Sequence, residues 1–110
     1  MKNERKVEEQ SNNRKELIKA LTLDLPVLRA RLSLSQGDIA ERIGVSRQTY
    51  SGIETGKREM TWQIFMALLG CYFCNDQTLR MLYQKEDFIS NVKKIVEKDN
   101  SSLQSHTDIN

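Results

Sequence analysis

Residues that interrupt helices are scarce in this sequence, which has one proline and five glycines among its 110 residues. It also lacks the clusters of β-branched residues that favour strands. Good helix formers such as leucine, glutamate, lysine, arginine and alanine make up much of the chain. The composition therefore predicts an all-α protein, and the length favours one domain with tails.

A long apolar segment is missing as well. The longest apolar run covers residues 64–74 and is interrupted by Gly70. Crossing a bilayer takes about 20 apolar residues, so we predict no association with a membrane. The N-terminus is polar and charged, and it lacks the apolar core of a secretory signal. We therefore expect a cytoplasmic protein.

Cysteine and histidine are too few to build a zinc site. Cys71 and Cys74 are the only cysteines, and His106 is the only histidine. A structural zinc ion needs four ligands, and the C-x-x-C pair lies in an apolar segment, so both cysteines are interpreted as reduced core or near-core residues. Because the common catalytic sets and phosphate loops are also missing, we predict no catalytic residue, metal, cofactor or small-molecule ligand.

Charge of one sign is not in large excess, since the formal net charge is +2. Overall charge alone therefore does not indicate a nucleic-acid partner. Residues 25–70 hold six Lys/Arg and four Asp/Glu, whereas residues 71–110 hold five and six. A mildly basic middle segment can still neutralise phosphates in a chain that is close to neutral.

Hydrophobic periodicity and capping residues divide the chain into four parts. We expect a flexible N-terminal arm over residues 1–20, with a short helix over residues 13–22 as the alternative. A compact domain follows at 21–75. A C-terminal helix is expected at 76–98 and a disordered tail at 99–110.

Within the compact domain, Asp24 and Pro26 suit the start of a helix, and two short helices follow with a tight turn between them. Gly44 is placed to end the first of these, and Ser46 to cap the second. Two short helices joined by a glycine-containing turn are the skeleton of a helix-turn-helix. Ala40 is small enough to let the two helices cross closely. The expected helices are 25–32, 36–43, 47–55 and 62–70.

The segment from Ser35 to Arg58 reads SQGDIAERIGVSRQTYSGIETGKR. It closely resembles the Cro/repressor (XRE-like) family of prokaryotic and phage regulators, and the resemblance extends over residues 25–73. It implies a compact five-helix bundle like that of lambda repressor, here with a helical C-terminal extension and flexible tails. It also implies a sequence-specific transcriptional regulator, a repressor, whose third helix enters the major groove of double-stranded DNA.

By this resemblance, the first turn of the third helix reads bases through Arg47, Gln48 and Thr49. Gln48 can bond an adenine edge, Arg47 a guanine or a phosphate, and Thr49 a thymine or a phosphate. Gly52 departs from the family pattern, because many members carry another base-reading side chain there. Either the helix lies very close to DNA at Gly52, or specificity comes mainly from residues 47–49.

The resemblance also implies contacts to the sugar–phosphate backbone. A hydroxyl, free N–H groups and two cations suit the loop after the third helix to this task, and a helix N-terminus favours phosphate. The expected phosphate-binding residues are Gln36, Ser46, Thr55, Gly56, Lys57 and Arg58. Arg29 and Glu54 are expected to form a structural ion pair that holds the third helix on the scaffold.

Family members commonly bind pseudo-palindromic operators as homodimers, which we expect here too. Residues 79–98 offer a candidate interface, a heptad-like stripe of Leu82, Ile89, Val92 and Val96. The alternative is that this stripe packs on the domain. A different function is also open: an antitoxin or adaptor that mainly binds a partner protein through residues 76–98, with DNA binding only autoregulatory.

Overall fold

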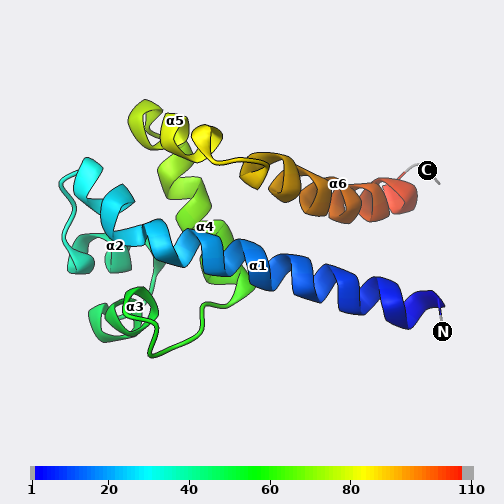
Figure 1. Ribbon diagram of the computed structural model, residues 1–110, viewed down its shortest axis with the longest axis horizontal. Helices are drawn as coiled ribbons and strands as arrows, with labels where there is room; N and C mark the ends of the chain where they lie inside the picture. The colour runs from blue at the N-terminus through cyan, green and yellow to red at the C-terminus, as the bar shows by residue number, and fades with distance from the viewer. Residues whose placement is uncertain (1, 108–110) are drawn as a thin grey trace.

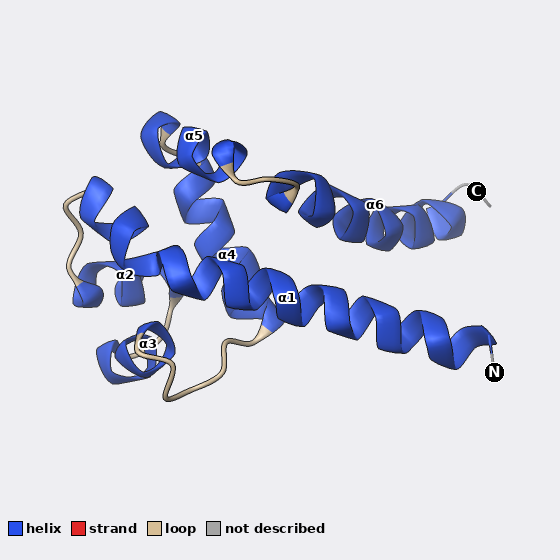
Figure 2. Cartoon of the chain, in the orientation of Figure 1, coloured by secondary structure: helices blue, strands red, loops and turns tan. Residues whose placement is uncertain are grey.

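The computed structural model describes residues 2–107, with the side chains of residues 13–98. This part of the chain consists of helices and connecting turns and contains no strand (Figure 2). The helices are α1 (Lys2–Arg31), α2 (Gln36–Ile43), α3 (Arg47–Glu54), α4 (Trp62–Phe73), α5 (Asp76–Gln84) and α6 (Phe88–Thr107). The predicted all-α helical bundle is confirmed. None of the described helices has the length and apolar character needed to span a bilayer.

Helix α1 is longer than the sequence predicts. We expected a flexible arm over residues 1–20 and a new helix near Pro26, but Lys2–Arg31 forms one helix with the proline inside it. A proline inside a helix removes one backbone hydrogen bond and costs about 3 kcal/mol. The predicted boundary before Pro26 is wrong, because packing on both sides of the proline outweighs this cost.

That packing comes from four leucines on one face of α1. Leu17, Leu21, Leu25 and Leu28 are all buried, the first at 5% exposure and the others at 0%. Burying a leucine side chain contributes about 1.5–3 kcal/mol. Since three of these leucines precede Pro26 and Leu28 follows it, the helix must remain continuous for all four to reach the same core.

The prediction of one continuous helix over residues 76–98 is wrong. The chain instead forms α5 and α6, which are separated at residues 85–87, where Asp87 has a positive φ of 62°. The break lets α6 turn back along α1. Residues 99–107, expected to be disordered, belong to α6, whereas residues 108–110 lie outside the described residues.

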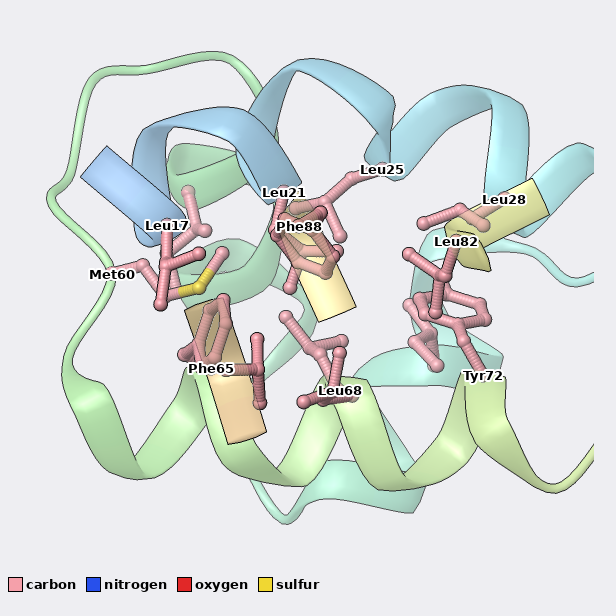
Figure 3. Packing of buried hydrophobic residues seen from close by; sticks show 14 of the residues in the cluster. Leu17, Leu21, Leu25, Leu28, Met60, Phe65, Leu68, Tyr72, Leu82 and Phe88 are labelled. Atoms are coloured by element: carbon pink, nitrogen blue, oxygen red, sulfur yellow. The ribbon is translucent and has the colours of Figure 1, made fainter. Parts of the chain in front are cut away.

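The core lies between α1 and α4, with α5 and the start of α6 closing it. Figure 3 shows the leucines of α1 facing Phe65, Leu68 and Tyr72 of α4. Phe88 joins from α6, and its ring centroid lies 6.3 Å from that of Phe65. The N-terminal residue of α6 therefore belongs to the same core as the compact domain, which anchors the C-terminal extension.

Helices α1 and α6 run in opposite directions, so both ends of the chain lie at one end of the molecule (Figure 1). Helices α2 and α3 lie at the other end. Lys85, in the turn between α5 and α6, fixes this arrangement: its ammonium pairs with Asp24 and donates to the carbonyl oxygen of Ala20 at 3.3 Å. The α2–α3 pair thus lies at the end of the molecule away from the C-terminal part of α6 (Figure 1).

The two cysteines differ in environment. Cys71 is half-buried against the core, and burial raises the pKa of its thiol, whereas Cys74 is exposed. Both thiols are free. The core or near-core interpretation therefore holds for Cys71 and is wrong for Cys74. Among the described residues, no three metal-binding side chains gather into a candidate site.

Candidate nucleic-acid interface

Helix α2 begins with a reciprocal cap and ends with a left-handed glycine. The Asp38 N–H donates to Ser35 Oγ at 3.0 Å, and the Ser35 N–H donates to Asp38 Oδ2 at 2.9 Å. These bonds lower the pKa of the Asp38 carboxyl. Gly44 has φ 77°, and its N–H donates to carbonyls of the last turn. Both ends of α2 are therefore fixed by local bonds that the sequence pattern predicts.

Ser46 caps α3 and organises its first turn. Its Oγ accepts the Thr49 N–H at 3.0 Å and donates to Thr49 Oγ1 at 2.9 Å. The next two side chains, Arg47 and Gln48, are exposed and have no hydrogen-bond or ion-pair partner within the described part of the chain. Their hydrogen-bonding groups are therefore available to a ligand outside the protein.

The opposite face of α3 is held against the domain. Tyr50 and Ile53 are both 0% exposed, and they meet the buried Ile39 and Ala40 of α2 in the shared core. A methyl side chain at position 40 lets two helix backbones approach closely where a larger residue would separate them. This close crossing fixes how far the first turn of α3 projects from the domain.

Arg29 and Glu54 join α1 to the end of α3. Arg29 Nη2 donates to Glu54 Oε1 at 2.8 Å and Nε donates to Oε2 at 3.1 Å, while Nη1 donates to the Leu34 carbonyl at 3.0 Å. The arginine thus binds both carboxylate oxygens and the segment that leads into α2. A bidentate pair of this kind fixes direction as well as distance.

The environment of this pair keeps Glu54 ionised. Burial alone would raise the pKa of Glu54, but the two hydrogen bonds from Arg29, with the Tyr50 and Gln36 side chains nearby, hold it below its ordinary value. The bond to Glu54 correspondingly raises the pKa of Arg29. Gln36, predicted only as a phosphate contact, therefore also lies beside the ion pair.

Two tyrosine hydroxyls lie buried behind the pair. Neither Tyr50 nor Tyr72 has a hydrogen-bond partner for its hydroxyl in the described part of the chain. Burial raises the pKa of both, that of Tyr72 to about 12. Both hydroxyls therefore stay protonated near neutral pH.

The chain that follows α3 turns back toward the first turn of the same helix. Thr55 Oγ1 donates to the Ser51 carbonyl at 2.8 Å, and Gly56 takes a left-handed conformation with φ 80°. Lys57 and Arg58 follow and are both exposed. Arg58 Nη1 donates to Thr49 Oγ1 at 3.1 Å, which the sequence did not indicate.

The predicted contact residues therefore lie on the exposed side of the helix-turn-helix. Thr49 and Gln36 are half-buried, and the rest are exposed. The structure brings Arg58 to Thr49 and Gln36 close to Glu54. The unusual glycine at position 52 is the one sequence signal for the first contact, and the second contact has none. The exposed set comprises Ser46, Arg47, Gln48, Thr55, Gly56, Lys57 and Arg58.

A capped α2, a tight left-handed turn and an α3 packed on one face and free on the other define a helix-turn-helix domain, the class of fold that presents a helix to DNA. A family model described as a helix-turn-helix domain matches residues 21–80 of the chain. The chain belongs to this family, which indicates DNA binding and whose members are typically not enzymes. No curated protein and no solved structure matches the chain.

Proposed function

We propose that the protein is a sequence-specific, double-stranded DNA-binding transcriptional regulator of the Cro/repressor type, acting as a repressor in the cytoplasm. The observation that carries this proposal is the first turn of α3. Arg47 and Gln48 are exposed and unpartnered within the described residues, on a helix whose other face is fully buried. A rigid helix with free polar side chains at its N-terminal end suits reading of base edges in the major groove.

In this mechanism, residues 47–49 read bases and their neighbours hold the phosphate backbone. Arg47 offers donors alone, which suit guanine, whereas Gln48 offers a donor and an acceptor, which suit adenine. The N-terminus of α2 at Gln36 favours a phosphate, and Lys57 in the loop after α3 supplies a cation for another. Contacts to phosphate supply affinity and register, and contacts to bases supply selectivity.

We also propose that two copies bind a pseudo-palindromic operator, each copy filling one half-site. The heptad-like stripe of residues 79–98 does not supply an open interface, because Leu82, Ile89 and Val92 are buried within one chain. Val96 is half-buried against the same core. Any dimer contact must therefore use another surface, and the test is the stoichiometry of the complex on a full operator and on a single half-site.

Burial of this stripe also weighs against the antitoxin or adaptor alternative. That function needs an apolar face on residues 76–98 that is left open for a partner. Phe88 and Ile95 are at most 7% exposed, so over residues 88–98, where side chains are described, the apolar side of α6 is covered by its own chain. The DNA-reading function therefore has structural support that the partner-binding function lacks.

The first experiment is selection of a random duplex library on the purified protein, followed by salt titration of the selected duplex. The proposal expects an enriched palindrome and a salt slope close to 0.9 per phosphate contact. Binding that is weak and equal on all duplexes would refute sequence-specific regulation.

Replacement of Gln48 by alanine tests base reading. A lost bidentate contact costs about 1–3 kcal/mol and should relax selectivity at one or two base pairs of each half-site. Binding to random duplex should change little, since no charge is removed. An equal loss on every duplex would remove Gln48 from the base-reading set.

Replacement of Lys57 by alanine tests the phosphate contacts. Specific and random DNA should both bind more weakly, and the salt slope should fall by about 0.9. The matched control is Lys94→Ala, which removes an exposed lysine from α6. If both variants lose affinity equally, the effect reflects overall charge and the assignment of Lys57 fails.

A further inference from the structure

Arg58 is exposed, but its side chain folds back along α3. Its backbone N–H donates to the Gly52 carbonyl oxygen at 3.0 Å. Its guanidinium then donates through Nη1 to Thr49 Oγ1 at 3.1 Å. The left-handed turn at Gly56 reverses the chain and makes this return possible. The side chain of Arg58 therefore runs from the last turn of α3 to its first.

Gly52 leaves the space that Arg58 occupies. A Cβ atom at position 52 would lie 3.4 Å from the Cβ of Arg58, which is tighter than most such contacts. Glycine inside a helix costs up to about 1 kcal/mol relative to alanine, so its presence in α3 needs a compensating reason. Contact between Arg58 and the helix surface supplies one that does not require a close approach to DNA.

The contact also fixes what the Thr49 hydroxyl can do. A hydroxyl has two acceptor lone pairs and one donor hydrogen. Thr49 Oγ1 accepts from Ser46 Oγ at 2.9 Å and from Arg58 at 3.1 Å, so both lone pairs are used. Its hydrogen is left to donate outward. Arg58 itself retains four of the five N–H donors of a guanidinium.

We propose that Arg58 is a specificity-determining residue: it belongs to the base-reading surface and, together with Thr49, presents hydrogen-bond donors to the N7 and O6 acceptors of a guanine in the major groove. The proposal rests on the proposed DNA-reading function and replaces the sequence-based assignment of Arg58 to the phosphate backbone. Guanine is the base whose major-groove edge offers two adjacent acceptors.

The test compares library selections for the wild-type protein and for Arg58→Lys, with Lys94→Arg, an exchange at an exposed lysine of α6, as the control. Lysine at position 58 keeps the charge but loses the planar fork of donors. The Arg58→Lys protein should lose at least about tenfold in its preference for guanine at one or two positions of each half-site. Affinity for random duplex and the salt slope should stay unchanged, and Lys94→Arg should leave every base preference in place.

Gly52→Ala provides an independent arm, because its methyl group would crowd the Cβ of Arg58 at 3.4 Å without altering any charge or any predicted contact residue. It should weaken the guanine preference at the same positions as Arg58→Lys, while circular dichroism shows a folded helical protein. If Arg58→Lys and Gly52→Ala both retain the wild-type preferences, Arg58 acts on phosphates alone and the inference is overturned, although the proposed function stands. If the wild-type protein selects no sequence, the proposed function and the inference about Arg58 fail together.

Discussion

Removing Arg29 should destabilise the domain more than any other single charge change in it. The Arg29→Met variant loses the two bonds to Glu54 and the bond to the Leu34 carbonyl. It also leaves the Glu54 side chain, only 7% exposed, without its cation. Breaking a buried ion pair by removing one partner costs about 3–5 kcal/mol. Because the Arg29 side chain is 22% exposed, we expect the lower end of this range, about 3 kcal/mol.

A double-mutant cycle separates the pair from the individual side chains. Arg29→Met, Glu54→Leu and the double variant are compared by urea denaturation followed with circular dichroism near neutral pH. The double variant should be more stable than the sum of the single losses predicts, with a coupling energy of about 2 kcal/mol. Additive losses, or a loss below about 1 kcal/mol for Arg29→Met, would show that the pair behaves like a surface salt bridge and would refute this reasoning.

Acid should weaken the same pair. The pKa of Glu54 is lower in the folded state than its ordinary value, so its contribution is complete above the ordinary pKa of 4.5 and is lost as pH falls through the folded value. Denaturation at about pH 3 and about pH 7 should show a drop in stability that is smaller in Glu54→Gln; an equal drop would contradict this. Gly44→Ala should lower the stability of the domain by about 1–2 kcal/mol, because φ is 77° at this position. The matched control Gly70→Ala lies inside α4 with open space for a Cβ and should raise the stability by about 0.5–1 kcal/mol. Equal shifts in melting temperature for the two variants would show that backbone strain at Gly44 is not the cause.

The helix-turn-helix could be predicted from sequence because its signals are local. The side chains of Ser35 and Ser46 each accept a hydrogen bond from the N–H group three residues later. Gly44 takes a left-handed conformation that residues with a Cβ rarely adopt. Each signal acts within one turn of helix, so neighbouring residues reveal it. The bounds of α2 agree with the sequence for the same reason.

The bounds of α1 and α6 could not be predicted this way, since they depend on contacts distant in sequence. Pro26 is tolerated because leucines on both sides of it meet α4, and the break before Phe88 is set by the return of α6 to α1. Lys85 bonds Ala20, sixty-five residues away. A periodicity argument carries no information about such pairings.

The candidate site divides along the same line. The free side chains of Arg47 and Gln48 follow from their place after a cap, whereas the position of Arg58 follows from a turn at Gly56 and from the missing side chain at Gly52. The donor surface at the front of α3 is therefore assembled from two segments of chain. Under the proposed DNA-reading function, a specificity code read from α3 alone would omit the guanidinium of Arg58. We therefore expect that exchanging residues 47–49 between related domains transfers selectivity only where Gly52 and Arg58 accompany them.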